Sequence, residues 1–432
     1  MDHESSAFRL HSPKRSLRSR DEWFRYYAGY SDRFVVDVLG HLRLPERSTV
    51  ADPWNGSGTT TKAAHDLGYN AYGFDVNPVM VLVAKARLLG QAIRPSHLSL
   101  AENMIERALG DGSLELPDEP LRAWFAPSSA AILRRLERAL QRLLVDTDTI
   151  RNLAHESSLD SVSPVAAFFY TALFRTVRGF VRTFEATNPT WITAPTKAHR
   201  VRPRPDDICL SFLAHVSEMA PLPGDGRRQI LSNMQAQSDI RLASSQNLPL
   251  APASVDAFIT SPPYCTRIDY AIATRPELAV LGLSTIDLPE LRRRMIGTPT
   301  VAKQTITPRK EWGGACLQFL DAVASHSSRA SATYYLKTHL QYFDSIYDSL
   351  RELDRALRPA GSCVIVVQDS FYKDIHNDLP QIFVQMSNSL GWVLKGLRSF
   401  PIERTMAAVN PRHQVYGRRG GAIESVLWFL RN

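Results

Sequence analysis

A loop with two glycines, set between two apolar segments, limits the folds open to this chain of 432 residues more than any other segment. Residues 50–60 (VADPWNGSGTT) begin with apolar residues, turn through Gly56 and Gly58, and lead into a segment up to Leu67 that is typical of a helix. A second apolar segment then ends at Asp75. Glycines let a backbone approach a ligand closely, and a helix N-terminus offers free N–H groups. The pattern predicts a strand–loop–helix–strand unit that binds a nucleotide-like molecule.

The loop matches neither of the two commonest nucleotide fingerprints. Asp75 follows Gly58 at close to the ~20-residue spacing of a carboxylate that holds ribose hydroxyls in βαβ nucleotide sites. However, position 61 is Thr rather than the third Gly or Ala of a dinucleotide site. The Gly-Lys-Ser/Thr ending of a phosphate-binding loop is also missing, because three threonines precede Lys62. NAD and ATP are therefore poor candidates for the ligand.

A second constrained segment is Ser261-Pro262-Pro263-Tyr264, which follows residues 255–259, a run typical of a short buried strand. Two consecutive prolines fix φ and remove two backbone donors, so the segment is stiff and presents carbonyl acceptors. The serine adds a hydroxyl acceptor, and the tyrosine adds a flat face for stacking. Such a group suits the exocyclic amino group of a nucleobase. Taken alone, the segment is equally compatible with a proline-stiffened turn after an edge strand.

Together these motifs resemble those of the S-adenosylmethionine-dependent amino-group DNA methyltransferases. Residues 52–60 resemble the cofactor loop of that family, residues 73–78 its second motif, and residues 423–429 its last core strand. Residues 261–264 resemble its catalytic motif in the form most common among N4-cytosine enzymes. The resemblance implies an α/β fold, a Rossmann-like methyltransferase with a mostly parallel central sheet. The apolar spacing between its motifs predicts a helical insertion in addition. The resemblance also implies S-adenosyl-L-methionine as the cofactor. The alternation of predicted strands and helices along the chain agrees with a mostly parallel sheet.

The resemblance also assigns roles to individual residues. Ser261 and the Pro262 carbonyl would accept hydrogen bonds from the target amino group, Pro263 would stiffen the motif, and Tyr264 would stack on the base. The residues expected to contact the cofactor are Tyr30, Asp52, Trp54, Gly56, Gly58, Thr59, Asp75 and Asp239. Asp75 would bind the ribose hydroxyls. Asp239, at the end of a predicted strand, would reach the adenine amino group, unless it is an aspartate of a surface turn. Asp369 is expected either in the pocket or as a helix N-cap.

The chain is expected to have three parts. Residues 1–22 carry Pro13, several serines and basic residues that include Lys14, Arg15, Arg18 and Arg20, and are predicted to be a flexible basic arm. Residues 23–94 and 236–432 form the predicted catalytic core. Residues 95–235 separate the two halves as a mainly helical insertion, a candidate DNA-contacting or target-recognition region. Apolar spacing predicts helices over residues 121–144 and 165–184, and both carry several arginines.

The charge of the chain favours a polyanionic partner. The formal net charge is +8 and the pI is about 9.3. Basic helical faces in the insertion would follow DNA phosphates, although a solvated arginine-rich surface has the same composition. The arginines expected to contact DNA are Arg135, Arg138, Arg142, Arg178, Arg182, Arg267 and Arg293. The loop after Tyr264 competes with the insertion as the region that determines specificity.

Other features narrow the class of protein. The four cysteines show no Cys-x-x-Cys pair, which predicts free thiols in a reducing cytosol and no zinc site. The N-terminus lacks an apolar signal segment, and the longest apolar run, residues 165–174, is too short to span a membrane. We therefore expect a cytoplasmic protein without a metal or a membrane segment.

These observations predict a site-specific DNA methyltransferase that acts on a flipped base. Cytosine N4 is the first expectation and adenine N6 the second, in restriction-modification or phage defence, with restriction or defence-system proteins as possible partners. Two alternatives stay open. One is an RNA amino-group methyltransferase, and the other is a non-catalytic methyltransferase fold that binds nucleic acid.

Overall fold

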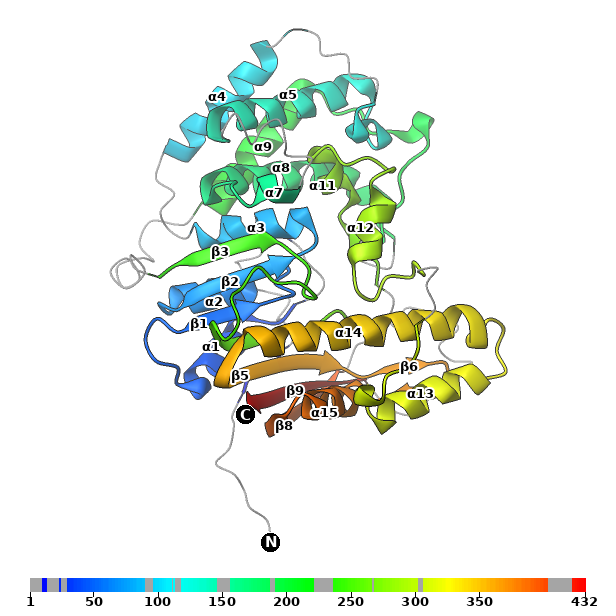
Figure 1. The fold of residues 1–432 in the computed structure, drawn as a ribbon. Helices are drawn as coiled ribbons and strands as arrows, with labels where there is room; N and C mark the ends of the chain where they lie inside the picture. Colours follow the sequence, from blue (N-terminus) through cyan, green and yellow to red (C-terminus); the bar gives the residue numbers. More distant parts are fainter. Residues whose placement is uncertain are drawn as a thin grey trace.

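The computed structural model describes residues 10–13, 23–24, 29–89, 96–110, 112, 118–145, 156–186, 191–220, 236–265, 268–301, 306–402 and 422–432. A seven-stranded sheet with the order β3-β2-β1-β4-β5-β9-β8 forms its centre (Figure 1). Its strands are β1 (Thr49–Asp52), β2 (Asn70–Asp75), β3 (Ser238–Leu242), β4 (Val255–Thr260), β5 (Leu357–Gln368), β8 (Trp392–Ile402) and β9 (Ala422–Arg431).

The sheet is mostly parallel, as the sequence predicts. Adjacent strands are parallel to one another from β3 through β2, β1 and β4 to β5. Strand β9 is antiparallel to both of its neighbours, β5 and β8. From β1 the chain proceeds outward to β2 and β3, and it then returns to the other side of β1 to form β4 and β5. The strand order therefore reverses between β1 and β4. In open α/β sheets, ligands bind at the carboxyl ends of the strands beside such a reversal.

Helices cover both faces of the sheet because successive side chains of a strand point to opposite faces. In β5, Val364 and Val366 pack with the helices α1 and α2, while Cys363 and Ile365 face α13, α14 and α15. The bounds of these helices are α1 (Asp32–Leu42), α2 (Thr59–Asp66), α13 (Gly314–Ser325), α14 (Leu336–Ala356) and α15 (Leu379–Ser389). The long helix α14 is preceded by a π-helical turn, η7 (Ser331–Tyr335).

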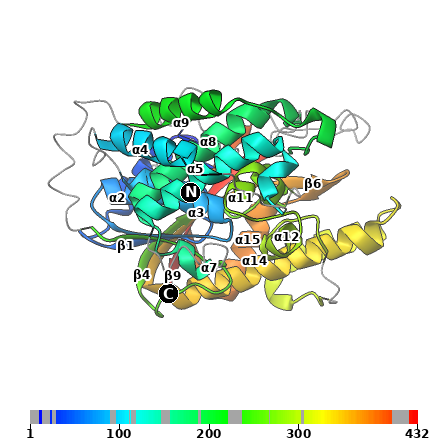
Figure 2. The ribbon, with the colours of Figure 1, turned by 90° about the horizontal axis from the view of Figure 1, so that it is seen from above.

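The insertion forms a further helical layer at the β3 edge of the sheet (Figures 1 and 2). Its core is shared with α3, which packs between this layer and the sheet. The elements here are α3 (Pro78–Leu88), α4 (Ser96–Gly110), η2 (Pro120–Ala123), α5 (Pro127–Leu144), α7 (Glu156–Leu159), α8 (Pro164–Val181), η3 (Arg182–Phe184), η4 (Lys197–His199) and α9 (Pro205–Met219).

Both predicted insertion helices are shorter than expected. The first starts at Pro127 rather than Leu121, because proline occupies the first turn of a helix readily and Leu121 belongs to the short turn η2. The second ends at Val181 and continues as the 3₁₀ turn η3. Of the predicted basic arm, residues 10–13 are described, and the Pro13 carbonyl accepts the Ser31 N–H at 2.8 Å.

The chain after β4 crosses from the sheet to the insertion. Leu278, Val280 and Leu291 of this segment belong to the same apolar core as α5 and α8. The remaining elements are α10 (Tyr270–Ala273), α11 (Arg275–Val280), α12 (Leu288–Arg294), η6 (Lys310–Trp312) and the small hairpin of β6 (Ser370–Tyr372) and β7 (Ile375–Asn377). No helix in the described part of the chain combines the length and the apolar character needed to cross a bilayer.

Candidate active site

The loops that follow β1, β2, β3 and β4 surround one cavity at the carboxyl edge of the parallel strands. The cavity encloses about 950 Å³ of empty space, part of which is open to solvent. The predicted residues in its wall are Tyr30, Asp52, Trp54, Gly56, Thr59, Asp75, Ser261, Pro262, Pro263 and Tyr264. The tertiary structure therefore brings the glycine loop, the acidic end of β2 and the Ser-Pro-Pro-Tyr segment to a single site.

The Asp52 carboxylate holds the base of the glycine loop rather than facing the cavity with free oxygens. Its Oδ1 accepts the Trp54 N–H at 3.1 Å and the Thr260 hydroxyl at 2.5 Å. Its Oδ2 accepts the Thr60 hydroxyl at 2.7 Å and the Tyr30 hydroxyl at 3.1 Å. The side chain is 2% exposed, and burial raises the pKa of Asp52 although these donors oppose the shift. Asp52 thus ties β1, β4 and α2 together beneath the cavity.

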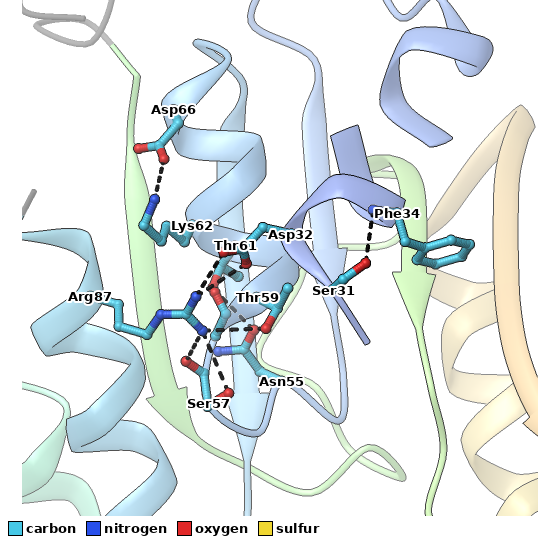
Figure 3. A network of polar contacts seen from close by, with 11 residues as sticks. Ser31, Asp32, Phe34, Asn55, Ser57, Thr59, Thr61, Lys62, Asp66 and Arg87 are labelled. Carbon is cyan, nitrogen blue, oxygen red and sulfur yellow. Dashed lines mark hydrogen bonds and ion pairs between the residues drawn. The ribbon is translucent and has the colours of Figure 1, made fainter. Parts of the chain in front are cut away.

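A buried arginine supports the other side of the same loop (Figure 3). Arg87 of α3 donates to the Ser57 carbonyl at 2.9 Å and to the Thr59 hydroxyl at 3.3 Å. Its second terminal nitrogen donates to Asp32, at the start of α1, at 3.1 Å. The guanidinium therefore binds the loop to two helices at once, so the loop has a fixed shape before any ligand binds.

Gly58, which is predicted to contact the cofactor, is not among the residues that line the cavity. It is the N-cap of α2 with φ +82°, in the left-handed region that favours glycine. A Cβ at this position would lie 2.8 Å from the Ala84 Cβ of α3. The glycine is needed for this turn and for the close packing of α2 on α3.

Asp75 ends β2 with its carboxylate directed at the loop. Oδ2 accepts the Gly56 N–H at 2.9 Å and Oδ1 accepts the Asn77 N–H at 2.8 Å. The carboxylate keeps lone-pair capacity for a ligand donor. Burial raises the pKa of Asp75 to about 6, although the backbone N–H groups of Asn77, Gly56 and Val76 oppose this shift and the nearby Asp52 adds to it. The carboxylate is therefore mainly ionised at neutral pH and protonated in mild acid.

This pKa predicts a pH dependence for ligand binding. The sequence predicts that Asp75 binds ribose hydroxyls. Hydroxyls that donate to the carboxylate would favour its ionised form, so binding would lower the pKa of Asp75 and release protons near pH 6. The affinity for S-adenosylmethionine should therefore decrease as the pH falls through about 6. Asp75→Asn should weaken binding roughly 10- to 100-fold at neutral pH and abolish the pH dependence. Calorimetric titrations between pH 5 and about 8 would check this, and a variant with the parent's pH profile would show that another group titrates.

The Ser261 hydroxyl has a defined orientation at the cavity wall. Its Oγ donates to the Val366 carbonyl of β5 at 3.0 Å. Because the single hydroxyl proton is used in this bond, the oxygen lone pairs are what the side chain can offer to a ligand. The Pro263 carbonyl accepts the Tyr342 hydroxyl of α14 at 2.9 Å. This bond uses the carbonyl of Pro263. The carbonyl predicted to bind the target amino group is that of Pro262.

Asp239 does not reach the cavity, contrary to the sequence prediction. It lies near the amino end of β3, opposite Tyr72 of β2, whereas Leu242 is opposite Asp75. The cavity lies at the carboxyl edge, so Asp239 is at the wrong end of its strand. Its carboxylate pairs instead with Arg241 at 2.6 Å. The residues that follow β3 and line the cavity are Ser244 and Ser245.

Asp369 fills neither predicted role. It accepts the Ile423 N–H at 2.7 Å and contacts His376 at 3.0 Å, and it is buried at the junction of β5 and β9. The N-cap of the next helix is Asp378.

Two arginines of the predicted basic faces are structural. Arg134 is buried between Glu119 and Glu137, at 2.8 Å from each, and donates to the Val280 carbonyl at 2.7 Å. Arg178 contacts Glu277, whose side chain is 0% exposed, and its guanidinium also donates to the Ala273 carbonyl at 2.6 Å. The sequence shows that arginines recur along a helix, but not which of them meet buried carboxylates. Arg178 therefore joins the insertion to the segment after the catalytic motif and is not part of an exposed basic face.

The other arginines predicted to contact DNA have different surroundings. Arg142 and Arg182 are exposed, and Arg135 and Arg138 are partly exposed. Arg293 is exposed and pairs with Glu290. Arg267 lies outside the described residues. Arg293 is not among the residues that line the cavity, whereas Arg294 lines it together with Met295 and Ile296. The sequence shows three consecutive arginines at residues 292–294, but only the fold shows that Arg294 is the one that lines the cavity.

Several wall residues were missed by the motif analysis. They are Gly29, Asn55, Ser57, Val76, Asn77, Met80, Tyr270 and the pair Ser244 and Ser245. Asn77 belongs to the segment that resembles the second motif, so its place was available from the sequence. Tyr270 and the two serines follow elements whose position depends on the sheet. Among the described residues, no group of His, Cys, Asp and Glu is arranged to hold a metal ion, and all four cysteines are free thiols.

The sheet order and the cavity define a Rossmann-like α/β fold with a ligand site at the carboxyl edge of its parallel strands. Residues 41–86 match the model of the N6/N4 methyltransferase family, described as a DNA methylase. The chain is 23% identical over 316 residues to the type II methyltransferase M.BsoBI of Geobacillus stearothermophilus, a match that covers 68% of this chain and 59% of that protein. It is 23% identical over 412 residues to M.MvaI of Kocuria varians, covering 90% and 85% of the two chains.

The match to M.AvaI of Nostoc sp. is 23% identical over 296 residues and covers 65% of this chain and 58% of that protein. The chain thus spans less than two thirds of the length of M.BsoBI and M.AvaI. The resemblance to the amino-group DNA methyltransferases is confirmed by these matches, and the family supports S-adenosyl-L-methionine as the cofactor.

Proposed function

We propose that this chain is a DNA methyltransferase that methylates an exocyclic amino group of a flipped base, with cytosine N4 as the preferred target. The observation that carries the proposal is the orientation of Ser261. Its hydroxyl proton is directed to the Val366 carbonyl, so the side chain offers lone pairs at the wall of a cavity beside Tyr264. An amino group, which donates hydrogen bonds, is the complementary ligand.

The residues of the cavity fit S-adenosyl-L-methionine. Asp75 has lone pairs for the ribose hydroxyls. Val76 and Met80 provide apolar surface next to it. The Trp54 Nε1 is buried and has no hydrogen-bond partner among the described residues, so it is a donor available at the wall. The cofactor would supply the methyl group as an electrophile on a positively charged sulfur.

The residues of the chain would then make the amino nitrogen a better nucleophile. The lone pair of an aromatic amine is delocalised into the ring. Hydrogen bonds from the amino group to Ser261 Oγ and to the Pro262 carbonyl favour a more tetrahedral nitrogen, which localises the lone pair. Holding the two reacting atoms in line supplies much of the remaining acceleration. The amine loses its proton after transfer, so no strong base is needed, in agreement with a neutral serine at this position.

The choice of cytosine N4 rests on the resemblance of the Ser-Pro-Pro-Tyr motif to N4-cytosine enzymes. The relatives are named type II methyltransferases, which suggests a role in restriction-modification for this chain as well. A partner nuclease or another defence protein would follow from that role.

The direct experiment is to identify the methylated nucleoside. The purified chain is incubated with labelled S-adenosylmethionine and either DNA or RNA of mixed sequence, which is then digested and analysed by mass spectrometry. N4-methylcytosine in DNA is the expected product. N6-methyladenine would change the target base, and label in RNA alone would favour the RNA methyltransferase. Cofactor binding without any transfer would indicate the non-catalytic alternative or a required partner.

The exposed face of α5 is proposed to contact DNA. Arg135, Arg138 and Arg142 are spaced three and four residues apart, so they lie along one side of this helix. Reversing all three charges to Glu should weaken DNA binding and reduce the slope of log K against log salt by up to about 3. Fluorescence anisotropy at several salt concentrations would measure both. Arg351→Glu, at an exposed position of α14, is the control; an unchanged slope in the triple variant would exclude this face.

A further inference from the structure

A buried carboxylate lies directly behind the catalytic motif without contacting the cavity. The Tyr264 hydroxyl donates to Oε1 of Glu424 at 3.0 Å. Glu424 is 9% exposed and belongs to β9. Because β9 is antiparallel to β5, its first residues return to the sheet edge where β5 ends, and Glu424 lies opposite Gln368. The last strand of the chain thereby reaches the motif that follows β4.

The backbone of Tyr264 is held as firmly as its hydroxyl. Pro262 and Pro263 restrict the preceding backbone, and the Tyr342 hydroxyl donates to the Pro263 carbonyl at 2.9 Å. Gly297, with φ +79°, approaches so closely that a Cβ there would lie 3.2 Å from the Tyr264 carbonyl oxygen. Only the two side-chain torsions of Tyr264 then stay variable, and the bond to Glu424 restrains them together with the hydrogen bond to Ser261.

We propose that Glu424 is a positioning residue for methyl transfer, whose carboxylate holds the Tyr264 hydroxyl and so fixes the ring on which the target base stacks. This inference rests on the proposed function. A base stacks productively only on a ring in one orientation, since the amino nitrogen must lie next to Ser261 Oγ. Burial and the Glu424 charge both raise the pKa of Tyr264, so the phenol keeps the proton that it donates.

The test compares three variants in single-turnover methyl transfer. Glu424→Gln keeps an oxygen that accepts the same bond and should transfer at nearly the parent rate. Glu424→Ala should be slower by roughly 10- to 100-fold, the usual cost of a misplaced reacting group. Tyr264→Phe loses the same bond and also the hydrogen bond of this hydroxyl with Ser261, so it should be slowed at least as much. The double variant should be no slower than Tyr264→Phe. The affinity for DNA should change little, because phosphate contacts dominate it.

A second readout does not depend on transfer. A 3-fluorotyrosine at position 264 should give a distinct ¹⁹F resonance in the parent and in Glu424→Gln, and a motionally averaged one in Glu424→Ala. Cofactor affinity and thermal melting show that each variant is folded, and Glu102→Ala on the exposed side of α4 is the control.

Three results would overturn the inference. The first is a parent-like transfer rate for Glu424→Ala. The second is a double variant, Glu424→Ala with Tyr264→Phe, in which the two rate losses multiply. The third is a Glu424→Gln rate as low as that of Glu424→Ala, which would make the charge of Glu424 rather than the hydrogen bond responsible. If the parent transfers no methyl group at all, the proposed function fails, whereas the ¹⁹F comparison still decides whether Glu424 holds the ring.

Discussion

Ser261→Ala should reduce methyl transfer by roughly 10²- to 10³-fold, the usual effect of removing one oriented hydrogen-bonding group from a reacting centre. The substitution removes the acceptor that the hydroxyl presents at the cavity wall while the prolines and Tyr264 stay in place. Cofactor affinity should be close to that of the parent, because Asp75 and the glycine loop do not contact Ser261 through any hydrogen bond described. Transfer rates and calorimetry on the same preparations would separate the two effects.

The matched control is Ser99→Ala on the exposed side of α4, where alanine also suits the helix. Losing the bond to the Val366 carbonyl should cost about 1 kcal/mol of folding free energy, so the variant should still be folded. If transfer and cofactor affinity fell together, the motif would be structural rather than catalytic. If neither fell, the amino group would have to be bound by other residues.

Asp52→Ala should have the largest effect on stability. The variant leaves several buried donors without their acceptor, including the Trp54 N–H and the Thr260 hydroxyl. The Thr60 hydroxyl and the Tyr30 hydroxyl both have the Ile259 carbonyl as a second acceptor, so part of the loss is recovered. We expect a decrease of about 3–5 kcal/mol in the free energy of unfolding, together with a strong loss of cofactor binding.

Urea unfolding would measure the stability change, and calorimetry the binding. Asp66→Ala is a suitable control on the neighbouring helix α2, because Asp66 makes a partly exposed pair with Lys62 at 2.5 Å (Figure 3). Such pairs contribute about 0.3–0.5 kcal/mol. An Asp52→Ala variant within about 1 kcal/mol of the parent would show that the carboxylate is not the support of the loop.

Much of the site could be predicted because its signals are local. Glycines at turns, consecutive prolines and acidic residues at strand ends act on the backbone within a few residues of themselves, so the loop at 52–60, the end of β2 and the Ser-Pro-Pro-Tyr segment were all identifiable. The prediction for Asp239 failed because it required the direction and the register of β3 relative to β2. Register depends on pairing with another strand and leaves little trace in five residues of sequence.

The sequence likewise does not show which arginines of the insertion are exposed. Composition and helical spacing indicated basic helices, but Arg134 and Arg178 face carboxylates from other parts of the chain, Glu119 and Glu277. These contacts make Arg134 and Arg178 links between the insertion and the segment after the catalytic motif, although Arg178 is a DNA contact in the sequence prediction.

The motifs, their order and the chemistry they offer were thus set by short-range backbone preferences, which the amino-acid sequence states directly. Two features depend on the packing of distant segments. The Ser261 hydroxyl donates to the Val366 carbonyl, and the Glu424 carboxylate accepts the Tyr264 hydroxyl. Tyr264 and Glu424 are 160 residues apart, and their contact exists because the antiparallel strand β9 pairs with β5 in the sheet. A hydrogen bond of this kind depends on three-dimensional distance, and no local pattern encodes that distance.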